Sequence, residues 1–294
     1  MDTTKRKIKQ LGIFLLVTFK LILGGTISAA DRSFTFAAID FPGAVLTVAS
    51  GISPGGEVVG RYQDAMGKIH GFLLSNENFS SIDFPGAAAT DARGIAPNGD
   101  IVGIATDPMG RGHGFLLSRG VFRAVDFPGH LHTWVQRITP TGKILGCYHD
   151  TDTMGTMFGI VISGTDFNTI SVPASMTNGA TPDGSKIAGH YTDMMTGHNH
   201  GFLLEDGDFR PFDVPGSTLT QAWDINPAGK TVGLYRDSAG KFHGFLLADG
   251  HFASIDFPEA LATRAFGINP GGDIVGSYVD SSNKTHGFLL SKHK

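Results

Sequence analysis

The sequence repeats one pattern six times, at a period of about 43 residues. A typical copy contains Asp-Phe-Pro-Gly, then Gly-Ile-x-Pro-x-Gly-x-x-Val-Gly-x-Tyr, then His-Gly-Phe-Leu-Leu. The central turn is present in every copy, at Pro54, Pro97, Pro140, Pro182, Pro227 and Pro270. Units of this length bury their apolar faces against neighbouring copies and form arrays or rings. The repeat therefore constrains the architecture, and function is to be sought where the copies differ.

Each copy divides into four short strands, A to D, which in the first copy span 47–53, 57–63, 70–74 and 79–84. The Pro-x-Gly turn between A and B and the Asp-x-x-Gly turn between B and C are typical of tight hairpins. No segment after residue 30 has a convincing helical period. Four antiparallel strands in about 43 residues match one blade of a β-propeller. We therefore predict an all-β fold, a six-bladed β-propeller with four antiparallel strands per blade.

The two ends of the repeat region predict how the ring closes. Residues 34–41 have the pattern of a D strand with no A, B or C strand before it. Residues 286–290 have the pattern of a C strand with no D strand after it. We expect the first to pair with the second, because this pairing completes a sixth blade and leaves no open edge.

The first 30 residues differ from the repeats and have the pattern of a secretory signal peptide. Lys5, Arg6, Lys7 and Lys9 precede the apolar run 11–19, and small residues lead to Ala30. We predict a signal peptide at 1–30 and a propeller domain at 31–294. The protein is then secreted, to the periplasm or the cell exterior, and the alternative is an uncleaved N-terminal anchor.

Charge restricts the partners of the exported chain. Removal of residues 1–30 takes away five basic residues and one acidic residue, so the net charge changes from −4 to −8. Such a surface has no electrostatic footprint for nucleic acid or anionic lipid. The single cysteine, Cys147, cannot form an internal disulfide. We expect a monomer with no cofactor, no nucleic-acid partner and no membrane association after cleavage.

The repeat motifs carry a resemblance. The sequence at 265–278, followed by His-Gly-Phe-Leu-Leu at 286–290, resembles the HAF family of extracellular repeats, named for a His-Ala-Phe motif. This chain has glycine in place of the alanine. The resemblance covers all six copies. It implies a secreted bacterial protein and gives no catalytic residues to transfer.

A residue that recurs in most blades is expected to hold the blades together, because one active site does not need six copies of its parts. The recurring His and an Asp six residues before it, such as His70 and Asp64, flank the B–C hairpin. We expect these two side chains to form a hydrogen bond across that hairpin.

The copies differ most at the start of strand A, which lines the axis of a propeller. The variable positions lie one and three residues after a recurring Thr, and both tryptophans of the chain are among them. The candidate ligand-binding residues are Asp91, Arg93, Trp134, Gln136, Gln221, Trp223 and Arg264. Side chains two residues apart on a strand point the same way, so these groups can converge on an axial funnel. Indoles with charged and amide groups suit a sugar or another polar ligand. The alternative is that they fill gaps between blades.

The third copy differs at a second place. His130 and His132 lie in its D–A loop, and Asp150 lies in its B–C loop. Two histidines at i and i+2 of an extended chain can face the same way and, with a carboxylate, can bind zinc or a similar ion. These three residues are the candidate metal ligands.

Two functions follow from these sites. The first is a non-catalytic propeller that binds a glycan or an extracellular protein surface at the axial funnel. The alternative is a metal-assisted lyase or hydrolase on the face formed by the D–A and B–C loops. The loops are short, which leaves little material for a catalytic apparatus, so binding is the favoured prediction.

Overall fold

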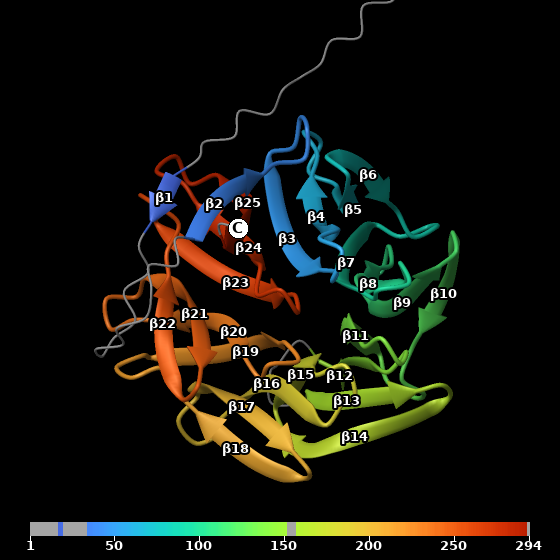
Figure 1. The fold of residues 1–294 in the computed structure, drawn as a ribbon. Coiled ribbons are helices and arrows are strands. Elements are labelled where there is room, and N and C mark those ends of the chain that lie inside the picture. Colours follow the sequence, from blue (N-terminus) through green and yellow to red (C-terminus); the bar gives the residue numbers. More distant parts are fainter. Residues whose placement is uncertain (1–16, 20–33, 152–156, 293–294) are drawn as a thin grey trace, which may run out of the picture.

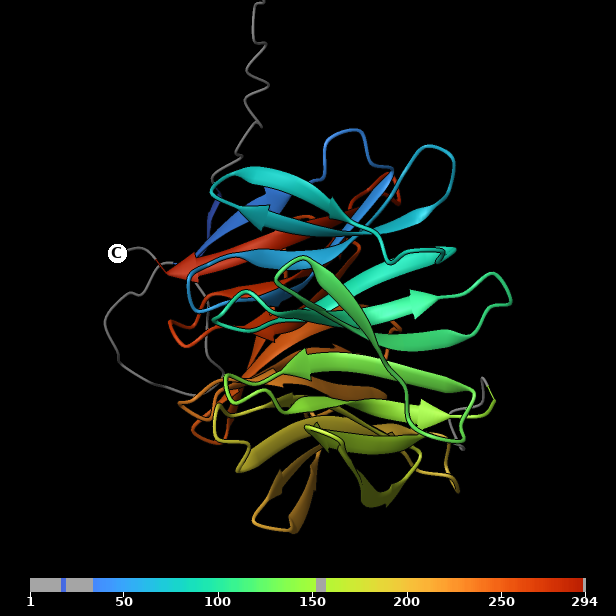
Figure 2. The ribbon, with the colours of Figure 1, turned by 90° about the vertical axis from the view of Figure 1, so that its right-hand side faces the viewer.

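The computed structural model describes residues 17–19, 34–151 and 157–292. Within these ranges the chain forms a ring of six antiparallel sheets around a central axis, as Figure 1 shows. Figure 2 views the ring from the side, with the connecting loops gathered on its two opposite faces. The prediction of a six-bladed β-propeller is confirmed. No helix of the described ranges is long and apolar enough to cross a membrane.

The innermost strand of each blade corresponds to strand A of the repeat. These strands are β3 (Leu46–Ile52), β7 (Ala89–Ile95), β11 (His132–Ile138), β15 (Ser175–Ala180), β19 (Leu219–Ile225) and β23 (Ala262–Ile268). The second strands are β4 (Val58–Gln63), β8 (Ile101–Thr106), β12 (Ile144–His149), β16 (Lys186–Thr192), β20 (Thr231–Arg236) and β24 (Ile274–Val279).

The two outer strands of each blade correspond to strands C and D. The third strands are β5 (Ile69–Ser75), β9 (Gly112–Ser118), β13 (Phe158–Ser163), β17 (Asn199–Glu205), β21 (Phe242–Ala248) and β25 (Thr285–Lys292). The fourth strands are β6 (Asn78–Ile82), β10 (Val121–Val125), β14 (Asp166–Pro173), β18 (Asp208–Phe212), β22 (His251–Ile255) and β2 (Phe34–Ile39).

The ring closes as the sequence predicts. Strand β2 pairs antiparallel with β25, with Ile39 opposite Gly287 and Phe36 opposite Leu290. The Phe36 ring also packs edge-on against Phe288 and Phe257, at centroid distances of 5.5 and 5.1 Å. The sixth blade is therefore built from both ends of the repeat region.

One further short strand, β1 (Val17–Phe19), pairs with the outer edge of β2. It falls within the segment that we predict to be a signal peptide. The rest of that prediction, including the cleavage point after Ala30, lies outside the described residues. Cleavage there would leave β2 as the edge strand of its blade.

The core lies between neighbouring blades. A typical cluster joins Val59 and Ile82 of the first blade to Ala92 and Phe115 of the second. Each blade except the third also places a phenylalanine with no exposed surface on its third strand, and these residues are Phe72, Phe115, Phe202, Phe245 and Phe288. Because the packing repeats from blade to blade, no single blade holds the centre of the fold.

The glycine of the Val-Gly-x-Tyr motif is required by packing within its own blade. A Cβ on Gly60 would lie 2.8 Å from the Phe72 ring and would overlap the carbonyl oxygen of Val48, and all three residues belong to the first blade. Gly233 has the same surroundings in the fifth blade, beneath the ring of Phe245. The glycine therefore gives space to the buried phenylalanine.

The recurring histidine is held by two carboxylates. His70 Nε2 lies 3.3 Å from Asp64, as predicted, and His70 Nδ1 lies 2.6 Å from Asp83, which is a closer contact. His286 is placed in the same way, between Asp280 and Asp40, and Asp40 comes from the start of the ring. Each such histidine therefore ties the B–C hairpin to the turn that follows the outer strand of its blade.

Candidate functional site

The axis has two ends, which we name after the residues that surround them. The Thr end is formed by six equivalent residues at the start of the inner strands, which are Thr47, Thr90, Thr133, Ser175, Thr220 and Thr263. The Pro end is formed by the turns that follow these strands, at Pro54, Pro97, Pro140, Pro182, Pro227 and Pro270. The predicted ligand-binding residues start at the Thr end.

A β-bulge interrupts the inner strand of every blade at the same position. In each blade, the residue three positions after the Thr-end residue has no partner on the second strand, because the register shifts there. The six bulged residues are Ser50, Arg93, Gln136, Asn178, Trp223 and Phe266. A bulge bends its strand and re-aims a side chain. We call these six residues the bulge ring.

The backbones of neighbouring blades come close immediately after the bulge ring. The next residue is glycine in four blades, namely Gly51, Gly94, Gly179 and Gly267. A Cβ on Gly94 would lie 2.9 Å from Cα of Arg137, and one on Gly179 would lie 2.6 Å from Cα of Asp224. Side chains are therefore excluded at these glycines, and Arg137 and Asp224 occupy the equivalent positions of the third and fifth blades.

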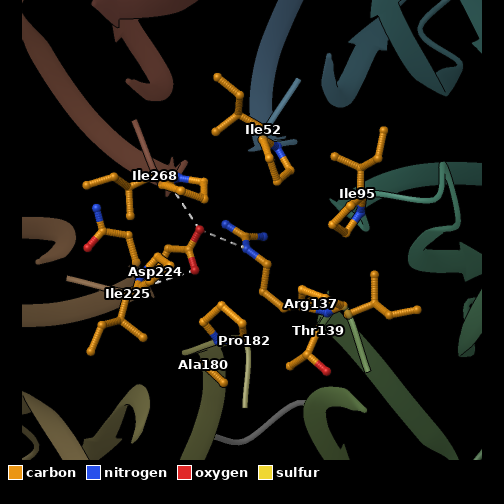
Figure 3. Close-up of a pocket in the computed structure, with 17 residues that line it drawn as sticks. Ile52, Ile95, Arg137, Thr139, Ala180, Pro182, Asp224, Ile225 and Ile268 are labelled. Carbon is orange, nitrogen blue, oxygen red and sulfur yellow. Dashed lines mark hydrogen bonds and ion pairs between the residues drawn. The ribbon is translucent and has the colours of Figure 1, made fainter. Parts of the chain in front are cut away.

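Arg137 and Asp224 together close the axis, and we call this pair the axial plug (Figure 3). Arg137 Nε lies 3.3 Å from Asp224 Oδ2. The two terminal nitrogens of Arg137 donate hydrogen bonds to four carbonyl oxygens of the bulge ring, those of Ser50, Arg93, Gln136 and Phe266. One guanidinium group thus contacts backbone from four blades and a carboxylate from a fifth.

Asp224 is held as firmly as its partner. Its carboxylate accepts hydrogen bonds from the backbone N–H groups of Ile225 and Ile268, at 2.9 and 3.1 Å. Burial raises the pKa of Asp224, although Arg137 and these two N–H groups act in the opposite direction. The pair therefore belongs to the class of buried ion pairs, in which loss of one partner leaves an uncompensated charge.

A cavity of about 80 Å³ opens on the Pro side of the axial plug. Its wall is made of Ile52, Ile95, Ile138, Ala180, Ile225 and Ile268 with the six prolines of the Pro end, and Arg137 and Asp224 lie at its base (Figure 3). A cavity of this size holds several water molecules or one small group. It lies at the opposite end of the axis from the predicted ligand-binding residues.

At the Thr end, the structure brings Asp91 and Arg93 together with Arg61, which the sequence argument missed. Asp91 Oδ2 lies 2.6 Å from a terminal nitrogen of Arg61 and 2.7 Å from one of Arg93. Burial lowers the pKa of Arg93; nearby Arg61 and Arg137 act in the same direction and Asp91 opposes them. Two guanidinium groups therefore share one carboxylate oxygen.

Gln136 points toward the fourth blade, whereas the indole of Trp134 lies against Gly112 of the second blade. Two residues of the fourth blade complete the set. Trp134 packs against the buried cluster of Cys147, Met157 and Met176, and Gln136 Nε2 lies 3.5 Å from the sulfur of Met176. Asn178 is fully buried and donates a hydrogen bond to the carbonyl oxygen of Ala222. Met176 and Asn178 occupy the same two positions as the predicted residues of other blades. Their signal was the spacing to Gly179, which matches the spacing to Gly51 and its equivalents.

The remaining predicted residues contact the blade on one or both sides. Trp223 packs edge-on against Phe266, with ring centroids 5.1 Å apart. Gln221 donates a hydrogen bond of 2.9 Å to Asn199 of the preceding blade. The guanidinium carbon of Arg264 lies 4.5 Å from the centre of the Phe242 ring. These side chains therefore fill space between blades while remaining partly exposed at the Thr end.

Six polar atoms at these positions are buried without a hydrogen-bond partner among the described residues. The two donors are Arg93 Nε and Trp223 Nε1, and the other four atoms are oxygens, those of Ser50 (Oγ), Asp91 (Oδ1), Gln136 (Oε1) and Asn178 (Oδ1). Buried polar groups in folded proteins nearly always have partners, and each exception calls for an explanation such as a bound molecule. The Thr end of the axis therefore has unused capacity for both donors and acceptors.

The predicted metal ligands are engaged in other contacts. His130 Nδ1 lies 3.0 Å from Asp150, whose other carboxylate oxygen accepts the backbone N–H of Leu131. His132 Nδ1 accepts the backbone N–H of Gly112, and its ring stacks on His149. Among residues 34–151 and 157–292 there is no group of three His, Cys, Asp or Glu side chains placed to hold a metal ion. A metal site at these residues stays a prediction.

Comparison with known proteins relates the chain to other propellers through structure alone. No protein-family model and no curated protein sequence matches it. TolB from Acinetobacter baumannii is similar with a TM-score of 0.56 at 12% identity, covering 80% of this chain and 64% of that one. The fucose-specific lectin from Aleuria aurantia is similar with a TM-score of 0.53 at 12% identity, covering 86% and 96%. The β-propeller domain of the Trilobed protease from Pyrococcus furiosus has a TM-score of 0.52 at 11% identity, covering 85% and 96%. At these identities the likeness is one of fold.

Proposed function

We propose that this protein is a secreted, non-catalytic propeller that binds a saccharide at the Thr end of its axis. The observation that carries the proposal is the set of six unpartnered polar atoms around that end, two donors and four acceptors. A sugar hydroxyl both donates and accepts hydrogen bonds, so one saccharide ring can serve both kinds of atom.

The apolar side chains at the same end fit this ligand class. Trp134 and Trp223 are both partly exposed there, and they come from the third and fifth blades. An indole offers a wide apolar face together with one N–H donor, which suits a ligand with C–H faces and hydroxyl edges. Asp91, Gln221 and Arg264 add polar groups at the position equivalent to Trp134 in the second, fifth and sixth blades.

The comparisons support the proposal by showing that a protein of similar fold binds a sugar. The fucose-specific lectin from Aleuria aurantia has a similar fold, and it recognises a sugar, as its name states. Export agrees with this role, because the segment 1–30 has the pattern of a signal peptide and glycans are abundant outside the cell. The short loops of the chain favour binding over catalysis.

The proposal is tested by screening the purified protein on a glycan array and measuring the affinity of each hit by calorimetry. Trp223→Ala is expected to weaken binding by at least about tenfold, since it removes a stacking face and a donor that are each worth about 1 kcal/mol. Trp223→Phe keeps the face and removes only the donor, so its loss should be smaller.

A control variant separates binding from folding. Met195→Ala changes a side chain that is 96% exposed, on a B–C hairpin and not on an inner strand, and should bind as the parent does. Circular dichroism confirms that each variant is folded. If no saccharide binds, or if Trp223→Ala binds as well as Met195→Ala, the proposed function is wrong.

A further inference from the structure

The charged groups at the Thr end do not balance. Arg61 and Arg93 share one oxygen of Asp91, at 2.6 and 2.7 Å. The nearby guanidinium of Arg137 is already matched by Asp224. One positive charge beside Asp91 therefore has no carboxylate of its own.

Arg93 still has a hydrogen-bond donor without an acceptor. Its Nε–H is buried and has no acceptor among the described residues, although one of its terminal nitrogens is bonded to Asp91. Its pKa is lowered by burial and by the neighbouring Arg61 and Arg137. An anionic group beside Arg93 would accept from the free N–H and offset this repulsion.

A second guanidinium group at the same end also lacks a carboxylate. Arg264 lies over the ring of Phe242, and no carboxylate of the described residues pairs with it. Burial lowers the pKa of Arg264 as well. Among the charged side chains on or bonded to the start of the inner strands, three guanidinium groups therefore stand against the single carboxylate of Asp91, although the whole chain has a net charge of −4.

The unpartnered oxygens exclude a simple anion as the ligand. Gln136 Oε1 and Asn178 Oδ1 are acceptors, and an ionised sulfate or carboxylate has no hydrogen to donate to them. Ser50 is 2% exposed and Asn178 is fully buried, so these groups belong to the interior of the site. A ligand that satisfies the whole set carries both hydroxyl groups and a negative charge.

We infer that the saccharide bound at the Thr end is acidic and carries a carboxylate, as a uronate residue does. This inference rests on the proposed function and adds to it the charge of the ligand. Arg93 receives the carboxylate, and the oxygens of Ser50, Gln136 and Asn178 accept hydrogen bonds from the hydroxyl groups. Arg93 is therefore the residue that sets the preference for an acidic over a neutral sugar.

The test compares matched sugars that differ only at C6. Galacturonate is measured against galactose, and glucuronate against glucose, by calorimetry on the full protein. We expect the uronate of the preferred pair to bind at least about tenfold more tightly than its neutral partner. Added salt should reduce this ratio, because it screens the charge interaction and not the hydroxyl contacts.

Two variants assign the preference to its residue. Arg93→Gln should reduce the ratio of uronate affinity to neutral-sugar affinity to near one. If Arg93→Gln fails to fold, Arg264→Gln tests the same preference with the second unpaired guanidinium group of the Thr end. Arg210→Gln, at a side chain that is 63% exposed on an outer strand, should leave the ratio unchanged.

The outcomes separate the two proposals. If a neutral sugar binds as tightly as its uronate, or if the ratio survives both Arg93→Gln and Arg264→Gln, the inference of an acidic ligand is overturned while saccharide binding stands. If no sugar of either kind binds, on the array or in solution, saccharide binding itself is refuted.

Discussion

Replacing Asp224 by asparagine tests whether the axial plug stabilises the ring. The substitution keeps the size of the side chain and removes its charge, so Arg137 is left buried with only carbonyl oxygens around it. Breaking a buried ion pair by changing one partner costs about 3–5 kcal/mol. The four carbonyl groups still solvate the guanidinium in part, which places the expected loss near the lower limit, about 3 kcal/mol.

This loss is large relative to the total free energy of unfolding. Folded domains are stable by about 5–15 kcal/mol, so the variant should lose a substantial part of its free energy of unfolding. For a chain of this size each kcal/mol corresponds to about 2–4 °C, which gives a fall in Tm of about 6–12 °C. Urea denaturation followed by circular dichroism should show a lower midpoint at an unchanged slope.

A double-mutant cycle makes the prediction specific to the pair. Arg137→Gln alone should also destabilise, but Arg137→Gln combined with Asp224→Asn should cost less than the sum of the two, by about 1–3 kcal/mol of coupling. Asp208→Asn, at an exposed carboxylate that pairs with Arg210, is the control and should have no measurable effect. Strictly additive losses, or equal midpoints for Asp224→Asn and Asp208→Asn, would refute the reasoning.

Three further predictions concern the ring. Phe36→Ala should lower the free energy of unfolding by about 3–5 kcal/mol, since the ring is 2% exposed and packs across the closure; a loss below about 1 kcal/mol in urea denaturation would argue against closure by β2. Gly233→Ala should destabilise by at least about 2 kcal/mol because its Cβ would lie 2.6 Å from a buried ring, whereas Gly55→Ala meets only the flexible end of a side chain and should be tolerated; equal urea midpoints for the two would contradict this. Hydrogen bonds from the Ser282 hydroxyl, the Lys284 N–H and a histidine lower the pKa of Asp280. The stability that this carboxylate contributes should therefore be lost as the pH falls below the pKa of an unfolded Asp, about 4. A urea midpoint that is unchanged from pH 5 to pH 3, or that falls equally in Asp280→Asn, would contradict this prediction.

The repeat predicted the fold because its signals are redundant. The Pro-x-Gly turn occurs six times at a nearly constant spacing, so an error in one copy is corrected by the others. The same redundancy identified the pairing of 34–41 with 286–290, since the first segment is a D strand without a blade of its own and the last copy lacks only a D strand. The hydrogen bond from His70 to Asp64 was foreseen, and the closer contact with Asp83 had its own unused signal, a spacing of 13 residues that recurs in four blades.

The site was predicted less completely, for physical reasons. The β-bulge that creates the bulge ring leaves no mark in the apolar alternation of one strand, because it adds a single residue at a position occupied by Ser, Arg, Gln, Asn, Trp or Phe. Met176 and Asn178 were missed because the fourth blade has Ser175 in place of the marker threonine.

The axial plug was missed for a different reason. Two residues of opposite charge stand at a position that is glycine in the other four copies, and this contrast was visible in the sequence. The sequence could not show how close these two side chains lie, because the third and fifth blades are not neighbours and approach each other only at the axis of the ring. In the structure Arg137 Nε and Asp224 Oδ2 lie 3.3 Å apart.

The closure of the ring also orders events during biosynthesis. His286 of the last hairpin and its partner Asp40 are 246 positions apart. The two parts of the sixth blade are therefore synthesised at the start and at the end of the repeat region. Contacts this distant in sequence are slow to form, because the intervening loop must first be closed at an entropic cost. Until β25 has been synthesised, the inner edge of β2 has no partner strand. An export route that keeps the polypeptide unfolded until it is complete would spare it that exposure.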